Sequence, residues 1–411
     1  MSDAHHHERE IGVKHAVTPL ELFFDLVFVF ALTQVTTLLA DDLTWLGMLR
    51  GFAVLAAIWW AWAGFAWLTN SIRIDDDVSS RLVMLATMGV MLVVGLAAPQ
   101  AFGTYSILFG AAYLVVRLLH IALYAVTTRS DPDVFGAVIR LAPGMVAAPL
   151  LILAAGFVPE GWARAALWAL ALAIDFLSPV FAGTSGWRID APHFAERHGL
   201  VIIIALGESV VALGVSAAGE TLTPEVVAAA VLGVVVISAM WWLYFDIVAV
   251  VAERRLSALS GAAQAAMARD SYSYIHLLMV FGIVLTALGL KKTLLDIGEP
   301  LKVIPAVALF GGVALYLLAH IAFRMRNYGS LNTQRLVVAI VLLALIPAAL
   351  VLSAQVSLTI LAAVLMLAAP AVMAADDAGH LQFAFGLVEM LEALAGEAAT
   401  VDHHGVAVGG N

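Results

Sequence analysis

Long apolar runs, separated by short polar segments, occupy the chain from about residue 18 to residue 374. A helix needs roughly 20 mostly apolar residues to cross the hydrocarbon core of a bilayer, which is about 30 Å thick. Twelve runs of about that length are bounded by charged residues, Pro or Gly. The pattern predicts an all-α polytopic membrane protein with about twelve transmembrane helices, at residues 18–40, 46–70, 81–99, 102–127, 134–157, 161–184, 199–218, 224–251, 272–290, 303–323, 335–353 and 356–374.

The composition narrows the class of protein further. Of the 411 residues, 63% are hydrophobic and 12% are charged. A soluble domain carries about half apolar and about a quarter charged residues, so this chain has too few polar side chains to cover a soluble surface. A water-soluble enzyme is therefore excluded. The net charge of -10 and the lack of an arginine-rich stripe argue against nucleic acid as a partner, and the absence of Cys excludes disulfides and Cys-based metal sites.

The Lys and Arg residues other than Arg117 are distributed unevenly between the two sides of the membrane. Fourteen lie on the side of the N-terminus and five on the opposite side. Because cytoplasmic loops carry the excess of Lys and Arg, both termini are predicted to be cytoplasmic. An even number of spans agrees with this orientation, whereas Lys291, Lys292 and Lys302 form an external cluster that departs from the rule.

Two polar tails flank the predicted spans. Residues 1–17 contain His5, His6 and His7 and are interpreted as a flexible cytoplasmic tail rather than as a metal site. Residues 375–411 contain no Lys or Arg and several Asp and Glu, and apolar residues recur at helical spacing from Phe385 to Leu394. We expect an acidic cytoplasmic tail with a short amphipathic helix, which is either a solvated extension or a regulatory, partner-binding element.

The two halves of the chain resemble each other. Residues 26–40 align with residues 200–214, the next span of each half carries a Trp pair, and the fourth carries His-Ile-Ala. The order of these matches predicts a six-helix unit that is duplicated, over residues 18–185 and 186–374, with both copies in the same orientation. The aligned pairs are Leu26 with Leu200, Val27 with Val201, Ala31 with Ala205, Leu32 with Leu206, Leu39 with Leu213, Trp59-Trp60 with Trp241-Trp242, and His120 with His320.

Three sequence blocks point to a family. They are TPLELFFDLVFVFALTQ in the first span, HFAERHGLVIIIALGES at the start of the second half, and WWLYFD at residues 241–246. These blocks resemble the bacterial low temperature requirement A (LtrA) family, and the similarity runs from about residue 15 to residue 375. The resemblance implies a multi-pass protein of the bacterial cytoplasmic (inner) membrane with a role in growth at low temperature. It supplies no biochemical activity and no residue with a known role.

Glu208 is the strongest single candidate for a functional residue. An ionisable group inside a span costs about 2.5–3.5 kcal/mol on insertion scales and needs a partner or a wet cavity. Glu208 lies near the middle of its predicted span, and Gly207 beside it is expected to let another backbone approach. Such a carboxylate suits proton exchange, although a hydrogen bond to Ser209, Gln34 or Thr33 would make it a packing residue instead. The aligned position in the first half is Gln34. Arg197 is predicted to reach Glu208 only through water or an intermediate group.

Glu21 and Asp25 share one face of the first span because they are four residues apart. Both follow Pro19 at the start of the helix, where negative charge favours the helix dipole. Two interpretations remain open at this point. The pair either stabilises the N-terminus of the helix or forms the cytoplasmic mouth of a path for a cation or a proton.

Arg117 and His120 lie three residues apart in the fourth span and share a face. Buried Arg117 needs an acid, for which the sequence offers Asp25, Asp175 or Glu208. His120 and its counterpart His320 either relay protons or act as interfacial hydrogen-bonding residues. Further titratable residues are expected in the cytoplasmic halves of their spans or between the repeats, as a relay or a gate: Asp175, Asp246, His276, His320, Glu21, Glu196, Arg197 and His198.

Two further patterns have a plain structural interpretation. Between the repeats, Asp190 is predicted to cap a short helix that contains His193, Glu196 and His198. The spacing of these three residues scatters them around the helix, so no metal site is predicted. The cluster Trp59, Trp60, Trp62 and Trp67 is favoured as packing over a wall for an apolar substrate.

These observations lead to one preferred interpretation and two alternatives. A secondary transporter or proton-linked permease fits the duplicated halves and the inward-skewed titratable groups. In this transporter interpretation, Glu208 is the protonation or cation site, and Arg117 is its charge partner or binds an anion. His120 and Asp25 relay protons to the cytoplasm. Glu208, Arg117 and Asp25 are then expected to line one cavity.

No cofactor is expected, and the partners are the lipid bilayer and an unknown small solute or proton. The alternatives are a membrane enzyme acting on a lipid-linked substrate and a structural or sensory protein.

Overall fold

The computed structural model describes residues 17–71, 77–246, 248–368 and 370, and over these residues it is all-helical. Within those ranges the only strand-like pairing is an isolated bridge between Pro300 and Ser353. The α-helices are α1 (Pro19–Asp41), α2 (Trp45–Ser71), α3 (Val78–Ala97), α4 (Ser106–Thr127), α5 (Pro132–Gly156), α6 (Trp162–Ala182), α7 (Ala191–Ala218), α8 (Pro224–Phe245), α9 (Val248–Ser257), α10 (Gly261–Met267), α11 (His276–Leu295), α12 (Val303–Ala306), α13 (Gly312–Tyr328), α14 (Thr333–Ala349) and a last helix, Ala354–Ala368. A 3-10 turn, η3 (Ala98–Gln100), and two π-helices, η4 (Ala268–Ile275) and η5 (Val307–Gly311), continue neighbouring helices.

Ten helices in the described part of the chain are long and apolar enough to cross a membrane. Three of them are composite. Helix α3 and η3 form Val78–Gln100, α10, η4 and α11 form Gly261–Leu295, and α12, η5 and α13 form Val303–Tyr328. The expected spans 335–353 and 356–374 correspond to the shorter apolar helices Thr333–Ala349 and Ala354–Ala368. The described residues therefore contain ten long helices, and α14 is shorter than the predicted span 335–353 because it ends at Ala349, just after its internal Pro347. The C-terminal part of the last predicted span, 356–374, lies outside the described residues.

Local chemistry explains where the first helices of the two halves begin. Thr18 and Glu21 form a capping box at the start of α1, with Pro19 in its first turn. Asp190 caps α7 by accepting a hydrogen bond from the backbone of His193. The short helix expected at this point is therefore the beginning of α7 itself. The expected amphipathic helix after residue 375 and the polar tail at residues 1–16 lie outside the described residues.

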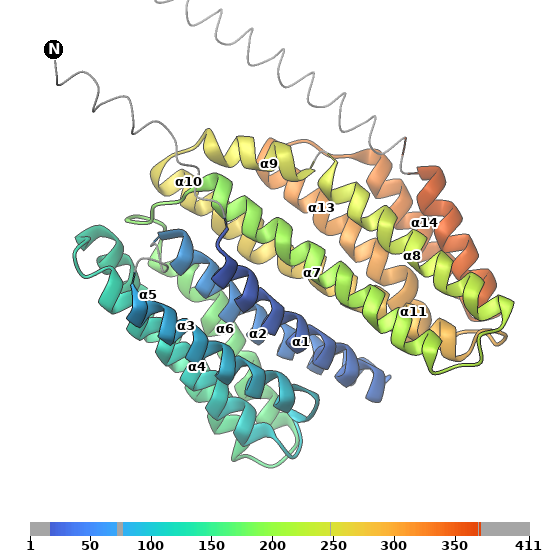
Figure 1. Cartoon of the computed structure of the whole chain (residues 1–411), viewed down its shortest axis with the longest axis horizontal. Helices are drawn as coiled ribbons and strands as arrows, with labels where there is room; N and C mark the ends of the chain where they lie inside the picture. Colours follow the sequence, from blue (N-terminus) through green and yellow to red (C-terminus); the bar gives the residue numbers. More distant parts are fainter. Residues whose placement is uncertain (1–16, 72–76, 247, 369, 371–411) are drawn as a thin grey trace, which may run out of the picture.

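The helices form two groups that meet along α1 and α7 (Figure 1). Helices α2 to α6 gather on one side, and α8, α11, α13 and α14 gather on the other. Helix α1 contacts α2 and α3 in the first group and α7 and α11 in the second, while α2 also contacts α7 and α11. The side chains that face one another across α1, α2 and α7 therefore join the two halves of the chain.

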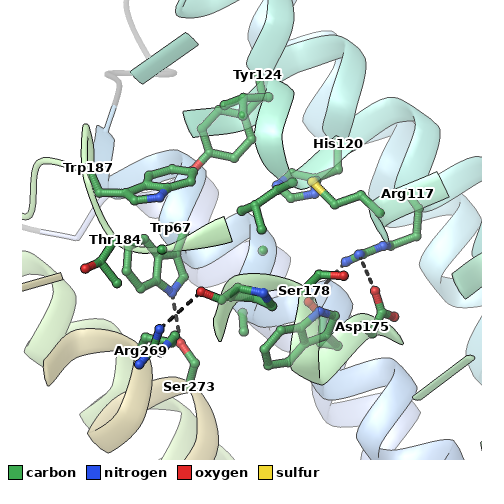
Figure 2. Close-up of a pocket in the computed structure, with 18 residues that line it drawn as sticks. Trp67, Arg117, His120, Tyr124, Asp175, Ser178, Thr184, Trp187, Arg269 and Ser273 are labelled. Atoms are coloured by element: carbon green, nitrogen blue, oxygen red, sulfur yellow. Dashed lines mark hydrogen bonds and ion pairs between the residues drawn. The ribbon is translucent and has the colours of Figure 1, made fainter. Parts of the chain in front are cut away.

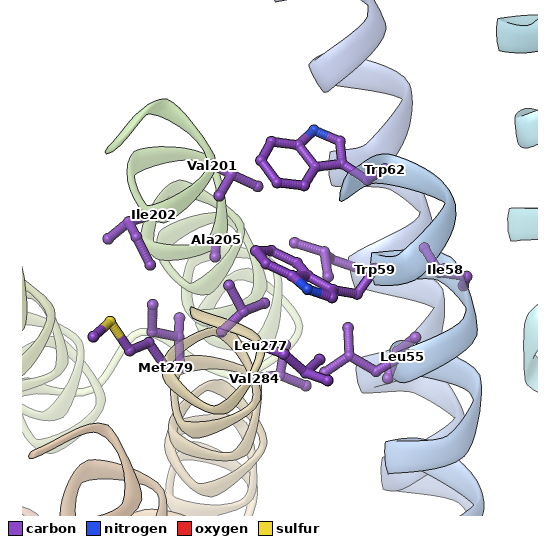
Figure 3. Packing of buried hydrophobic residues seen from close by; sticks show 14 of the residues in the cluster. Leu55, Ile58, Trp59, Trp62, Val201, Ile202, Ala205, Leu277, Met279 and Val284 are labelled. Carbon is purple, nitrogen blue, oxygen red and sulfur yellow. The ribbon is translucent and has the colours of Figure 1, made fainter. Parts of the chain in front are cut away.

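Aromatic side chains of α2 fill this junction. Trp59 and Trp62 are fully buried, with ring centroids 4.9 Å apart, and they point toward Val201 and Ala205 of α7 (Figure 3). Trp59 Nε1 also donates a hydrogen bond of 2.7 Å to the backbone carbonyl of Ser273 in η4. A buried indole N–H needs such a partner, because the membrane interior offers no water. Packing is thus the role of these two Trp residues, as the sequence favoured.

Glycines let α11 approach η5 and α13 closely. A Cβ atom added to Gly289 would lie 2.5 Å from both the Cα and the backbone N of Leu309. Gly282 and Gly312 meet in the same way, because a Cβ on either one would come within 2.8 Å of backbone atoms of the facing helix. Small residues at such contacts are typical of helix pairs in membranes. By contrast, Gly207 has no described atom within 4 Å of its Cβ position, so the close approach expected there is wrong.

We expect Gly289→Ala to destabilise the protein by about 1–3 kcal/mol, because the added methyl group meets rigid backbone. Gly207→Ala is the matched control in another span, and we expect it to be neutral or slightly stabilising, because Ala is the better helix former. The measurement is the unfolding temperature of each purified variant in detergent. Equal unfolding temperatures for the two variants would contradict this account of the contact between α11 and η5.

Candidate functional site

Buried charged residues of α1 and α7 form a compact group, which we call the α1–α7 charge cluster: Glu21, Asp25, His193 and Arg197. Arg197 is fully buried and donates to Glu21 Oε1 at 2.8 Å and to Asp25 Oδ1 at 2.7 Å. His193 Nε2 lies 3.2 Å from Glu21 Oε2. The cluster joins the first helix of one half to the first helix of the other.

Helix α2 completes this cluster with neutral groups. Trp62 Nε1 donates to Asp25 Oδ1 at 2.8 Å, and Thr69 Oγ1 accepts from Arg197 at 2.9 Å. The ring of Trp62 also lies under the Arg197 guanidinium, 5.8 Å from its carbon to the ring centroid. Arg197 is therefore paired with two carboxylates at its own depth rather than with Glu208, which the sequence placed about three turns away.

A second ion pair joins α4 to α6. Arg117 donates to Asp175 Oδ1 at 2.8 Å, and both side chains are almost completely buried. Tyr113 donates from its hydroxyl to the other oxygen, Asp175 Oδ2, at 3.2 Å. Of the three acids considered for Arg117, the structure selects Asp175.

This pair lines one end of a pocket of about 90 Å³ (Figure 2). Arg117 and Asp175 lie at that end, whereas Thr184 and Trp187 of the α6–α7 connection, together with Arg269 of η4, lie at the other. The pocket therefore reaches from a loop at one membrane face to the middle of α4.

Aromatic side chains form much of the pocket wall, so two Trp residues of α2 fit the less favoured of the two interpretations, a wall. Trp60 and Trp67 both line it. Trp60 is stacked on Phe176 at 4.3 Å and on Tyr274 at 5.5 Å between ring centroids. Trp67 donates from Nε1 to the hydroxyl of Ser273 at 2.9 Å, which holds its ring against η4. These contacts leave a rigid wall with an ion pair at its deep end.

His120 also lines the pocket, on the wall formed by α4. Its ring packs against Phe65 at 4.9 Å and Tyr124 at 5.1 Å between centroids, and neither ring nitrogen has a hydrogen-bond partner within the described ranges. Gly64 makes room for it, since a Cβ there would lie 2.6 Å from His120 Cε1. His120 thus borders the pocket, as a relay would require, but it is no interfacial hydrogen-bonding residue.

Glu208 is separate from both groups. It is 2% exposed, and neither carboxylate oxygen has a hydrogen-bond partner of ordinary geometry among the described side chains. Its polar neighbours are Thr33 and Thr36 of α1 and, at longer range, the cation of Lys291 in α11. The two threonine hydroxyls donate instead to the backbone carbonyls of α1, at 3.2 and 3.3 Å. Gln34, the aligned position, is only half-buried.

The expectation that Glu208, Arg117 and Asp25 line one cavity is wrong. Among the described residues that line the pocket, Arg117 is present and the other two are not. The physical reason is that each acid or cation has its own environment: Asp25 is engaged by Arg197, Arg117 by Asp175, and Glu208 lies between α7 and α1 near Lys291.

The remaining candidates divide into a buried group and an exposed group. His198, His276 and His320 lie in an aromatic cluster of the second half, where Tyr244 shares a hydrogen bond of 2.8 Å with His276 Nε2. Glu196 and Asp246 are exposed, and Glu196 accepts a bond from the backbone of Val17. Within the described ranges, no three His, Asp or Glu side chains are placed as a set of metal ligands.

Sequence reasoning missed the neutral partners Trp62, Thr69 and Tyr113, and it missed the cluster itself. A signal for the cluster was nevertheless present. The alignment that places Leu200 on Leu26 also places Arg197 at the level of Phe23, midway between Glu21 and Asp25. A cation and two acids at the same depth of two equivalent helices point to an ion pair between them.

Comparisons with known proteins agree with the resemblance of the sequence blocks. The family model of the bacterial low temperature requirement A protein (LtrA) matches residues 16–370. An uncharacterized protein of Rhizobium meliloti (strain 1021) is 32% identical over 286 residues, which cover 66% of this chain and 67% of that protein. No solved structure matches the chain.

The Arg117–Asp175 pair makes a testable contribution to stability. We expect Asp175→Asn to lower the free energy of unfolding by about 3–5 kcal/mol, because it leaves a buried cation without its counterion. Replacing both residues, as Arg117→Met with Asp175→Leu, is expected to recover most of the loss. Unfolding temperatures in detergent measure both effects.

Asp42→Asn is the control, because it alters an exposed ion pair with Arg50 at 4.0 Å, and such pairs contribute about 0–1 kcal/mol. A double variant no more stable than Asp175→Asn would show that the pair is not the source of the effect.

Proposed function

This chain belongs to the bacterial low temperature requirement A family of multi-pass membrane proteins, and we propose that it is a secondary transporter of a small solute. The pocket between α2, α4, α5, α6 and η4 is the observation that carries the proposal. It joins a loop at one membrane face to a buried ion pair in the middle of the helices. A membrane protein can offer charged groups to a solute without exposing those groups to lipid. It does so by placing an ion pair at the end of a pocket that is otherwise largely apolar.

In this proposal, Arg117 and Asp175 bind the polar part of the solute and His120 lies beside its path. The aromatic walls formed by Trp60 and Trp67 contact the apolar part. Glu208 is outside the pocket, and it serves as a second titratable position deeper in α7. Glu196 and Asp246, which are exposed, have no part in the solute site.

The contacts between helices support a duplicated architecture. In the first half α1 contacts α3, α3 contacts α4, and α4 contacts α5. In the second half α7 contacts α11, α11 contacts α13, and α13 contacts α14, which is the same series in the equivalent helices. We propose twelve membrane-crossing segments in two six-helix repeats, with the shorter Thr333–Ala349 and Ala354–Ala368 as the last two. Parallel repeats of this kind are a common basis of alternating access in transporters.

We further propose that the protein lies in the bacterial inner membrane with both termini in the cytoplasm. The excess of Lys and Arg on the side of the N-terminus supports this orientation. The mouth of the pocket, at Thr184 and Trp187 in the α6–α7 connection, then opens to the cytoplasm.

The orientation is tested by single Cys substitutions, because the natural chain contains no Cys. Ser130 lies in the α4–α5 connection and Thr221 in the α7–α8 connection, and both are exposed. In intact cells, a membrane-impermeant maleimide is expected to label Thr221→Cys and to label Ser130→Cys only after permeabilisation. The reverse pattern would place the pocket mouth on the outside.

Transport is tested with purified protein in proteoliposomes, a pH-sensitive dye inside, and a panel of small organic acids, amines and sugars. Met145→Trp in α5 fills the pocket and is expected to reduce flux of the transported solute at least tenfold. The matched control is Leu150→Trp in the same helix, whose side chain is 46% exposed outside the pocket and whose flux should stay near that of the natural protein.

If Met145→Trp leaves the flux unchanged, the pocket is not the solute site and the assignment is wrong. The same preparations also separate transport from the main alternative. If no solute moves, but a lipid extract incubated with the protein is covalently altered, a membrane enzyme acting on a lipid-linked substrate replaces the transporter.

A further inference from the structure

The α1–α7 charge cluster holds two carboxylates and one guanidinium. Glu21, Asp25 and Arg197 are 3%, 0% and 0% exposed, so water does not screen them. If both acids were ionised, the cluster would carry an excess negative charge unless His193 were a cation. The protonation of His193 therefore decides the charge balance.

Hydrogen bonds fix His193 as a neutral imidazole. The backbone N–H of Asp190 donates to Asn70 Oδ1 at 3.0 Å, and Asn70 Nδ2 donates to the carbonyl of Asp190 at 2.8 Å, so the amide orientation is set. Asn70 Nδ2 also lies 3.2 Å from His193 Nδ1. This nitrogen must accept, because the amide nitrogen can only donate. His193 Nε2 then carries the hydrogen and donates to Glu21.

The two carboxylates differ sharply in the donors they receive. Glu21 accepts from Arg197 on Oε1, and from the backbone of Thr18 at 2.9 Å and from His193 on Oε2. Asp25 accepts from Arg197 and from Trp62, but both donors reach the same oxygen, Oδ1. Asp25 Oδ2 is buried and has no partner in the described part of the chain. An anionic oxygen without a donor in a low dielectric is costly, far more so than a hydroxyl there.

We propose that Asp25 is a proton-binding site and that, in the arrangement of α1 and α7 described above, Oδ2 carries the proton. Glu21 stays ionised and balances Arg197, so the cluster as a whole is neutral. The groups that act on Asp25 are Arg197 and Glu21. Helix α2 adds only the neutral Trp62, Thr69 and Asn70 around the cluster, and His198 of α7 faces Trp59, Trp62 and His276 instead of the carboxylates.

The position of Asp25 makes the proton sensitive to the contact between the two halves. The acid belongs to α1 and its guanidinium partner to α7, so movement of the halves apart removes Arg197 and admits water to Oδ2. A solvated Asp is ionised at neutral pH, and the proton then passes to water. Closing the contact takes one proton from water onto Oδ2. Use of this proton as the coupling ion rests on the transporter function proposed above, whereas the protonation itself does not.

The test is infrared spectroscopy of the purified full chain at neutral pH in H2O and in D2O. A protonated carboxylic acid gives a carbonyl stretch that shifts in D2O, and we expect Asp25→Asn to remove one such band. Glu208→Gln is the control, because Glu208 also lacks a hydrogen-bond partner among the described residues. This variant is expected to keep the band that Asp25→Asn removes. A spectrum in which Asp25→Asn removes no carboxylic acid band would overturn the proposal.

Stability gives an independent measurement, because Asn resembles a protonated Asp in shape and charge. Asp25→Asn is expected to keep the unfolding temperature at neutral pH close to that of the natural protein. Glu21→Gln removes an ionised partner of Arg197, and it is expected to lower the unfolding temperature clearly. If Asp25→Asn is the more damaging of the two, Asp25 is ionised and the proposal is wrong. Neither measurement requires a transported solute. A negative result here would therefore overturn the proton site and leave the proposed transport function untouched, and a negative transport assay would leave the proton site untouched.

Discussion

Arg197 occupies a position where no water reaches it, and the junction of the two halves depends on how its charge is met. A lone guanidinium at that depth would be expelled toward the membrane surface or would prevent the halves from closing. Two carboxylates from α1, a hydroxyl and an indole ring from α2 make its burial possible. The apolar packing of Trp59 and Trp62 against α7 surrounds these contacts, so the polar and apolar parts of the junction require each other.

Every buried charge in this protein needs partners, and the buried acids Asp175, Asp25 and Glu208 meet this need in three different ways. One acid, Asp175, receives one donor on each oxygen, from Arg117 and from Tyr113. Another, Asp25, shares its cation with a neighbour, and one of its oxygens receives no donor from the described residues. The third, Glu208, has threonines nearby whose hydroxyls bond to their own helix. The residues are chemically alike, and the geometry of the facing helix decides which donors each carboxylate receives.

Much of the architecture was accessible from the sequence, because hydrophobic length and capping are local properties. The spans predicted to begin at residues 18 and 224 correspond to α1 and α8, which start at Pro19 and Pro224, each after a capping Thr. The end of α14 was predicted too late, since a run of apolar residues does not reveal that the helix ends at Ala349. Pairings between helices were harder to foresee. Arg117 had three possible acids, and nothing within α4 selects among them; the choice of Asp175 depends on how α4 lies against α6.

Ser273 and Arg269 of η4 have a consequence for the organisation of the chain. They line a pocket whose other walls come from α2, α4, α5, α6 and the α6–α7 connection, and Ser273 is held there by Trp59 and Trp67. One wall of a cavity in the first half is thus supplied by the second. A six-helix subunit made from the first half alone would lack that wall and would need a companion subunit to restore it. Fusing both halves in one polypeptide guarantees that the wall is present in every molecule, at a fixed ratio and without an assembly step.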